Sequence, residues 1–89
     1  MMMYRFTFSQ DFKKHYKKMS AQEKKQITNK LEMLAKDPSH PSLRTKRIKV
    51  TDKLYESSVN MDIRILWYYE DDRVIILADV GHHDILKRF

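Results

Sequence analysis

The chain has 89 residues with one glycine and no cysteine, and it carries 18 Lys or Arg against 12 Asp or Glu. This length predicts one domain over residues 1–89 with a single small core. The lack of cysteine excludes a disulfide framework and thiolate chemistry, and no apolar run approaches the ~20 residues that span a bilayer. We therefore expect a cytoplasmic protein that stays out of the membrane and uses no metal or other cofactor.

The positive charge is concentrated in the first part of the chain. Residues 1–53 carry 14 Lys or Arg against 5 Asp or Glu, a balance of +9, whereas residues 54–89 carry 4 against 7, a balance of −3. A positive field attracts polyanions and speeds their association. The charge pattern therefore indicates RNA, DNA or an acidic protein as the partner.

The chain begins with a short strand and a first helix. Tyr4, Phe6 and Phe8 alternate with polar residues, which is typical of a half-buried strand. Ser9 then offers a side-chain oxygen that can cap a helix. The apolar stripe of this helix is Phe12, Tyr16 and Met19, and its outer lysines include Lys14 and Lys18.

A second helix follows at once. Ser20 and Glu23 match a capping box, in which each side chain satisfies a free backbone donor of the other residue. Ile27, Leu31 and Leu34 form the next apolar stripe, and the helix should end near Asp37, before Pro38. The two segments are predicted to form an antiparallel helical hairpin.

Residues 37–42 have loop composition, and residues 43–50 hold the densest basic patch of the chain. Four cations fall within six residues there. We expect this patch to bind nucleic acid phosphates, together with the outer lysines of the first helix. The predicted RNA-binding residues are Arg44, Lys46, Arg47, Lys49, Lys14 and Lys18.

Three strands complete the predicted fold. Residues 54–59, 63–69 and 73–80 have strand composition, separated by turns at 60–62 and 70–72. The last run is almost entirely aliphatic, which predicts a central strand ended by Gly81. The class is α+β, a compact single domain in the order β-α-α-β-β-β, with its last three strands in an antiparallel meander and room for a short helical turn at the C-terminus.

His82 and His83 come directly after the last predicted strand. Histidine can both take and give a proton near neutral pH, so a pair fixed at a strand end suits acid/base chemistry. The alternative is that both are solvent-facing or structural loop residues. A zinc site with Asp84 is disfavoured, because adjacent residues rarely converge on one ion.

Arg64 stands inside an apolar, aromatic strand, where a charge is costly unless it has a partner or faces solvent. If the last two strands are hairpin neighbours, Arg64 and His83 share one edge of the sheet. An Arg that neutralises a phosphate beside a His that moves a proton could cleave RNA through the ribose 2′-hydroxyl. The alternative is a cross-strand ion pair of Arg64 with Glu56 or Asp62.

The order of these segments resembles the RelE/ParE superfamily of toxins from type II toxin–antitoxin modules. The similarity lies in the Arg-bearing strand 62–68, the acidic turn 70–72 and the hydrophobic-Gly-basic segment 79–84. The resemblance implies a compact RelE-like fold and a ribosome-dependent endoribonuclease, or mRNA interferase, that cuts mRNA in the ribosomal A site and inhibits translation. It also implies a cognate antitoxin as a partner, beside the ribosome and mRNA.

The same resemblance implies the site residues. Arg64 matches the arginine that stabilises the transition state, and His83 matches a catalytic Arg or His. His82 falls where some members have a lysine. Phe89 falls near an aromatic residue that stacks on a base or takes part in proton transfer.

The chain departs from part of the family in its second strand. Some RelE members carry two lysines there, where this chain has Tyr55 and Ser57. Proton transfer would then fall on His83, with His82 or Glu56 as further candidates.

Two other functions remain open at the level of sequence. The ParE branch poisons DNA gyrase, and a third possibility is a non-catalytic RNA- or antitoxin-binding module with the same fold. We expect His15 and His40 to be ordinary surface residues, because one lies among lysines and the other in a loop.

Overall fold

The computed structural model describes residues 3–49 and 52–82. Its elements are β1 (Arg5–Phe8), α1 (Gln10–Lys17), α2 (Ala21–Lys36), the 3-10 helix η1 (Pro41–Leu43), β2 (Lys46–Arg47), β3 (Tyr55–Ser58), β4 (Ile63–Tyr69) and β5 (Val74–His82). The predicted order is confirmed. The segment predicted as loop and basic patch additionally contains η1 and β2.

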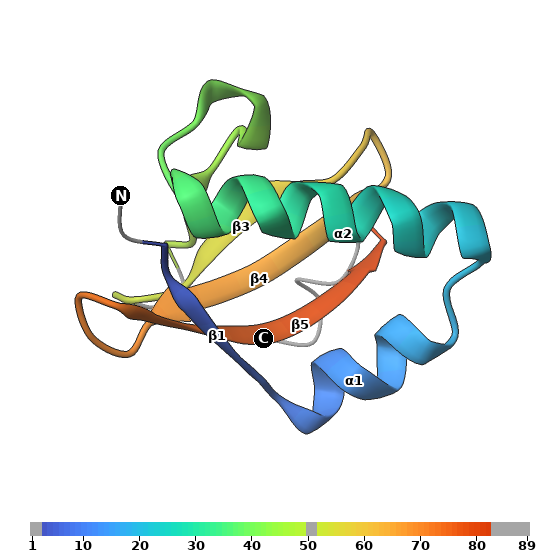
Figure 1. Ribbon diagram of the computed structural model, residues 1–89, viewed down its shortest axis with the longest axis horizontal. Coiled ribbons are helices and arrows are strands. Elements are labelled where there is room, and N and C mark those ends of the chain that lie inside the picture. Colours follow the sequence, from blue (N-terminus) through green and yellow to red (C-terminus); the bar gives the residue numbers. More distant parts are fainter. Residues whose placement is uncertain (1–2, 50–51, 83–89) are drawn as a thin grey trace.

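The strands form one sheet in the order β1-β5-β4-β3-β2. β3, β4 and β5 make the predicted antiparallel meander, and β2 adds to its outer edge. β1 pairs in parallel with β5, from Arg5 opposite Val74 to Phe8 opposite Leu77. The last strand therefore lies inside the sheet, between the first strand and β4, as Figure 1 shows.

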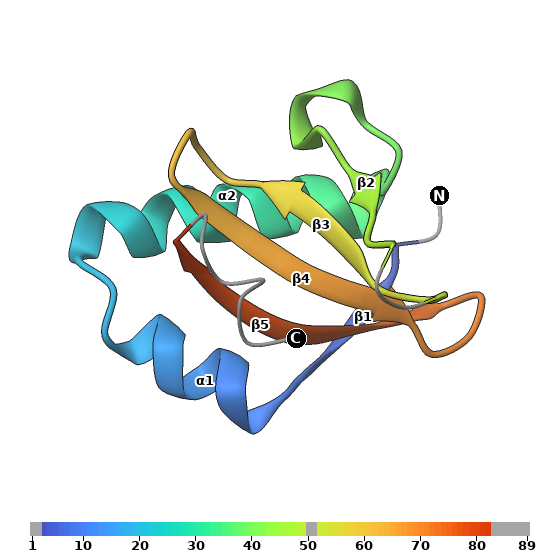
Figure 2. The same cartoon turned by 180° about the vertical axis from the view of Figure 1, so that it is seen from behind.

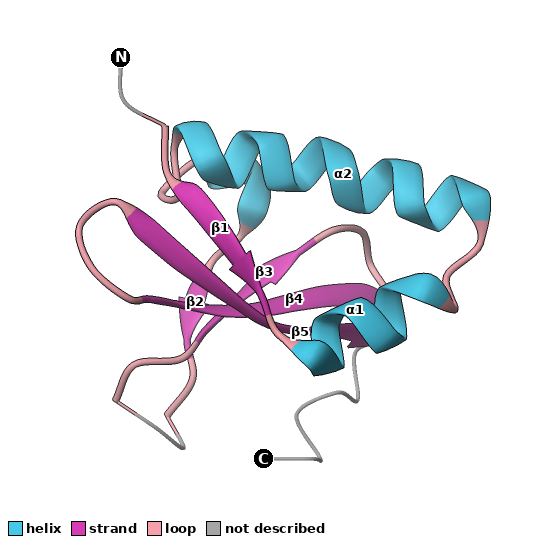
Figure 3. Cartoon of the chain, turned by 60° about the horizontal axis from the view of Figure 1, so that its bottom comes forward, coloured by secondary structure: helices cyan, strands magenta, loops and turns pink. Residues whose placement is uncertain are grey.

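Both helices lie on one side of the sheet. α2 crosses that face and α1 lies along β5 beyond the end of β1, with the two helices running in roughly opposite directions (Figures 1 and 3). The main core fills the space between the helices and the sheet. Its buried members are Phe12, Ile27, Leu34, Leu43, Val59, Ile63, Ile65, Trp67, Ile75, Leu77 and Val80.

Local signals in the sequence account for the helix ends. The Ser9 hydroxyl accepts from the Phe12 amide at 3.0 Å and donates to the Ala78 carbonyl at 2.6 Å, so it both begins α1 and ties it to β5. The capping box at the start of α2 is present, with hydrogen bonds of 2.8 and 3.1 Å between Ser20 and Glu23. α2 ends as predicted, with Asp37 as its C-cap.

The end of β5 differs from the prediction. Gly81 does not end the strand but is buried within it, opposite Arg64, and β5 continues to His82. The register between β4 and β5 shifts between Leu66 and Trp67. Leu66 pairs with Asp79 and Trp67 pairs with Leu77, so Ala78 has no partner in β4. Gly81 therefore lies within the sheet and not in a turn, and its lack of a side chain leaves room beside Arg64, its partner in β4.

The opposite face of the sheet carries no helix among the described residues, as Figure 2 shows from behind. A smaller cluster is buried there. It consists of Ile48, Leu54 and Leu66, with Tyr68 and Ala78 packed against it. No helix in the described part of the chain is long and apolar enough to cross a membrane.

Candidate functional site

Arg64 is half-buried in β4, between Ser58 of β3 and Gly81 of β5. Its Nη1 donates to the carbonyl oxygens of Asn60, at 2.6 Å, and Ile63, at 3.2 Å. These bonds hold the guanidinium at the turn between β3 and β4.

The alternative in which Arg64 forms an ion pair with Glu56 or Asp62 is wrong. Glu56 pairs with Lys46 at 3.6 Å, and Asp62 lies 2.7 Å from His82. Within the described residues, Arg64 has no carboxylate at ion-pair distance. Its charge is therefore available to an anion from outside the chain.

Arg64 lines a cleft of about 340 Å³ that we call the cationic cleft. Its lining residues are Lys30, Ser42, Arg44, Ser58, Val59, Asn60, Met61 and Arg64. Three of these are cations, and the described lining includes no Asp or Glu. Cationic and neutral donors without a competing carboxylate are the chemistry that binds a phosphate.

The four cations of the basic patch are all exposed, but the structure gives them different surroundings. Arg44 has a left-handed backbone, with φ of 48°, and follows η1 as its C-cap. Lys46 neutralises the buried Glu56. Arg47 donates to the Asp52 carbonyl, and Lys49 lies further along the chain. Only Arg44 lines the cationic cleft.

His82 lies on the other side of the sheet from Arg64. It pairs in register with Ile63, a core residue, so both side chains lie on the helical face. Its Nδ1 is 2.7 Å from Oδ2 of Asp62. The structure therefore does not bring His82 to Arg64, and His83 and Phe89 lie outside the described residues.

Tyr55 and Ser57 stand where some RelE members have lysines, but they lie on the core face of β3 and not on the face of Arg64. These two residues pair with Trp67 and Ile65, which belong to the core. The residues of β3 on the face of Arg64 are Glu56 and Ser58. A lysine at 55 or 57 would have its charge on the core side, so its absence has little bearing on chemistry at Arg64.

His15 is not the ordinary surface residue that we expected. Its Nδ1 lies 2.6 Å from Oδ1 of Asp79, and the Asp79 side chain is only 3% exposed. Nothing local indicates this pair, because 64 residues separate its members. Lys18 and both His15 and His82 line a cleft of about 260 Å³, whereas Lys14 is exposed on α1.

His40 also has a structural role. Its Nδ1 accepts a hydrogen bond of 3.0 Å from the Ser42 amide and so caps η1. In the described part of the chain, no three His, Asp or Glu side chains form a group that could hold a metal ion.

A mixed sheet with helices on one face and a cationic cleft at an Arg-bearing strand defines a small basic α+β protein suited to a polyanion. A family model described as "ParE toxin of type II toxin-antitoxin system, parDE" matches residues 3–86. The chain therefore belongs to this family of toxins, and the resemblance predicted from the sequence is confirmed. No curated protein sequence matches the chain.

Solved structures of related toxins have the same fold. The RelE–RelB complex of Pyrococcus horikoshii OT3 matches with 16% identity and a TM-score of 0.74 over 94% of this chain and 99% of that one. The YoeB/ParE toxin of Agrobacterium tumefaciens matches with 8% identity and a TM-score of 0.76 over 89% of this chain and 98% of that one. The RelB–RelE complex of Methanococcus jannaschii matches with 21% identity and a TM-score of 0.71 over 92% of this chain and 95% of that one. The predicted RelE-like fold is thus confirmed.

Proposed function

We propose that this toxin is a ribosome-dependent endoribonuclease that cuts mRNA in the A site and thereby inhibits translation in the cytoplasm. The observation that carries the proposal is Arg64 in the cationic cleft, held by backbone carbonyls and without a carboxylate partner among the described residues. RNA offers a phosphate for this cation and a 2′-hydroxyl as an internal nucleophile, so the reaction needs no metal.

Arg64 would stabilise the charge that develops on the phosphate as the 2′-hydroxyl attacks. A guanidinium suits this role, because its planar fork can donate to two phosphate oxygens at once. Preorganised donors of this kind are among the largest contributions to catalysis. The bonds from Nη1 to the Asn60 and Ile63 carbonyls fix the group before the substrate arrives.

His83 would protonate the leaving 5′-oxygen. It is next in sequence to His82, the last residue of β5. A positioned general acid contributes roughly 10²- to 10⁴-fold to the rate. Glu56 shares the sheet face of Arg64 and would accept the proton of the attacking 2′-hydroxyl, with His82 as the alternative acceptor. Phe89 would stack on a base.

The partners follow from the same proposal. The exposed cations of the basic patch, with Lys14 and Lys18, would bind ribosomal RNA. A cognate antitoxin would hold the toxin inactive, as the RelE–RelB complexes of two archaea suggest for relatives of this fold.

The first prediction tests Arg64. Arg64→Ala should lower mRNA cleavage on purified ribosomes by at least ~10²-fold, because the transition state loses its cation. Arg64→Lys should restore part of the rate, since Lys keeps the charge without the fork. Arg73→Ala, an exposed cation at the turn between β4 and β5, is the control and should cleave at the wild-type rate.

The second prediction tests His83. His83→Gln should reduce cleavage by at least ~10²-fold with little change in ribosome affinity, and the matching limb of the pH–rate profile should disappear. Full cleavage by a folded His83→Gln protein would transfer the proton role to Glu56 or His82.

The second candidate function is a gyrase poison, because the matching family model is described as ParE. DNA damage that depends on gyrase, with mRNA left intact, would establish that function. Growth inhibition with neither effect would favour the non-catalytic binding module.

A further inference from the structure

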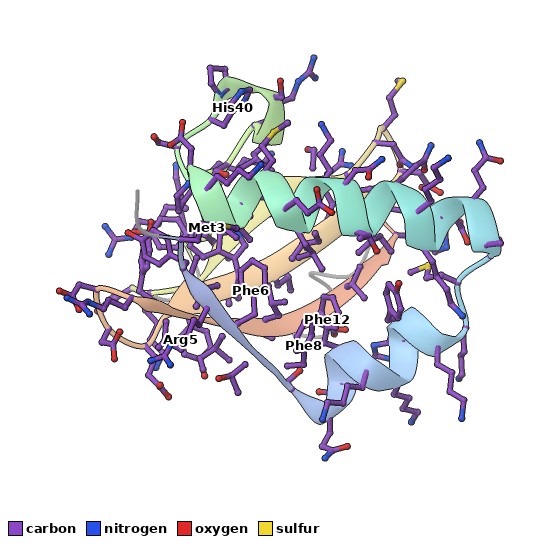
Figure 4. The ribbon with its side chains drawn as sticks, viewed as in Figure 1. Met3, Arg5, Phe6, Phe8, Phe12 and His40 are labelled. Atoms are coloured by element: carbon purple, nitrogen blue, oxygen red, sulfur yellow. The ribbon has the colours of Figure 1, made fainter. Side chains whose placement is uncertain are left out.

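A second cleft, of about 350 Å³, lies between the segment that follows α2 and the ends of β3 and β4. We call it the aromatic cleft. The lining residues that matter here are His40, Arg44, Thr45, Tyr55, Trp67 and Tyr69. Figure 4 shows His40 on the loop after α2, away from the core around Phe6 and Phe12. The volume falls in the range of small-ligand sites, about 300–1,000 Å³.

The aromatic rings of this cleft form a rigid platform. Tyr55 stacks on Trp67 at 4.8 Å, and Tyr69 packs edge-on against both, at 5.8 and 5.1 Å. Trp67 is buried and its Nε1 donates to the Ser57 hydroxyl at 2.8 Å. Tyr69 is 39% exposed, so it is the ring that a ligand can reach. A preformed aromatic surface of this kind stacks on any nucleobase.

Arg44 lines both the aromatic cleft and the cationic cleft. Its left-handed backbone, with φ of 48°, directs the chain sharply between η1 and β2. Such a conformation is uncommon for a residue other than glycine. Because Arg44 lines both clefts, a phosphate bound to it would connect a nucleotide in the aromatic cleft with the cationic cleft.

Tyr69 and Arg44 give the aromatic cleft two different kinds of polar group. Burial, the neighbouring Tyr4 and Tyr55 and the charge of Asp37 raise the pKa of the Tyr69 phenol. The phenol therefore stays protonated at neutral pH and can donate to a carbonyl or ring nitrogen of a base. The charge of Asp37 disfavours a phosphate beside Tyr69, whereas the guanidinium of Arg44 favours one.

We propose that the aromatic cleft binds one nucleotide of single-stranded RNA, with its base against Tyr69 and its phosphate on Arg44. The inference rests on the proposed function and specifies a nucleotide subsite that shares Arg44 with the cationic cleft. Recognition of unpaired RNA by aromatic stacking together with a cation is a general mode.

The experiment uses the full chain without ribosomes. Trp67 is the only tryptophan and lines the cleft, so its fluorescence reports on occupancy. Uridine and adenosine 5′-monophosphates should change the emission saturably, whereas inorganic phosphate should not. Tyr69→Leu should weaken nucleotide affinity by at least ~5-fold, because the base no longer has a ring to stack on.

Arg44→Ala should weaken binding of the monophosphates and leave that of the nucleosides unchanged, because only the phosphate contact is removed. Lys25→Ala, an exposed charge on α2, is the matched control and should leave both unchanged. An equal loss in Arg44→Ala and Lys25→Ala would reduce the effect to net charge and overturn the site.

A cross-linking measurement covers the case in which Tyr69→Leu does not fold. RNA with one 5-iodouridine should cross-link the wild-type chain at residues 38–45 or 67–69, and cross-links confined to other segments would overturn the proposal. An acidic peptide that changes Trp67 emission when nucleotides do not would assign the cleft to a protein partner instead.

The two proposals fail separately. Nucleotide binding in the aromatic cleft without mRNA cleavage would overturn only the proposal that the protein is an endoribonuclease. Cleavage at the wild-type rate by Tyr69→Leu, with no nucleotide effect on Trp67, would remove the nucleotide cleft alone.

Discussion

Two charged side chains inside the sheet show opposite solutions to the cost of burying a charge. Asp79, 2% exposed, has a histidine at 2.6 Å and the Val80 amide at 2.8 Å. Arg64 has only carbonyl partners among the described residues and stays half-buried at a cleft. A fully paired buried charge stabilises a fold, whereas an incompletely paired one at a surface suits a ligand.

The third prediction concerns His15. His15→Leu should lower the free energy of unfolding by about 1–3 kcal/mol, because the buried Asp79 carboxylate loses a hydrogen-bond partner. Lys14→Leu, on the exposed side of the same helix, is the control and should change stability little. The measurement is urea denaturation at neutral pH, and equal midpoints for His15→Leu and wild type would contradict the structural role of the pair.

For single residues, the sequence predicts a functional position where a residue breaks a local pattern. Arg64 stands out because a cation interrupts an apolar strand, and its place at a cleft could be anticipated. His15 does not, because its neighbours are lysines and its partner is 64 residues away. Pairs made by the fold alone leave no local signal.

Among the elements, those with both a local pattern and a local stop signal are the most predictable. Ser9, Ser20 and the acidic turn at 70–72 act within three or four residues, and the structure has each boundary within one residue of the prediction. The sequence does not predict β2 or the parallel pairing of β1. Each depends on a strand edge that a later part of the chain provides, β3 for β2 and β5 for β1. The prediction that Gly81 ends its strand is wrong, since a buried strand glycine and a turn glycine look alike in one sequence.

Aromatic contacts join the ends of three strands. Tyr4, before β1, and Tyr55 of β3 both pack on Tyr69 of β4, with centroids 5.7 and 5.8 Å away. This grouping raises the pKa of Tyr69 chiefly through burial and then through its neighbours. The packing at this end of the sheet therefore favours the neutral, protonated form of the Tyr69 phenol.

The fourth prediction gives the pH dependence of that contact. With a folded pKa above the unfolded value of about 10, the folded state holds the Tyr69 proton more tightly. Stability is complete below about pH 10 and falls as pH rises beyond it. In Tyr69→Phe this alkaline loss should be smaller, measured by thermal unfolding between about pH 8 and 11, and an unchanged alkaline profile would contradict the assignment.

For the whole molecule, the charge asymmetry of the sequence becomes a surface. The exposed lysines of α1 and the basic patch of β2 come from the basic first part of the chain, whereas the acidic second part supplies the inner strands. Helices on one face leave the face of Arg64 without helical cover in the described residues. Composition therefore predicts that the partner is a polyanion, whereas the topology of the sheet and helices determines where on the surface the cations lie.

The fifth prediction concerns this surface. Replacing Arg47 and Lys49 together with Ala should flatten the dependence of log K for ribosome binding on log salt, by about 0.7–0.9 for each phosphate that is no longer neutralised. The core should be unaffected, because both side chains are exposed and, within the described residues, the Arg47 guanidinium bonds only to the Asp52 carbonyl of a surface loop. Lys46→Ala differs, because it removes the partner of the buried Glu56. The paired control is Lys24→Ala with Lys25→Ala on α2. An unchanged slope would remove the basic patch from the binding surface.

The parallel pairing of β1 with β5 has a consequence for synthesis. A nascent chain that has released β1, α1 and α2 still lacks the strand on which β1 pairs and α1 packs. The Ser9 hydroxyl likewise has no Ala78 carbonyl to accept its hydrogen bond. Folding must wait until residues 74–82 have left the exit tunnel. The sheet can therefore close only after β5 has emerged, so its assembly follows the synthesis of every element that precedes β5 in the chain.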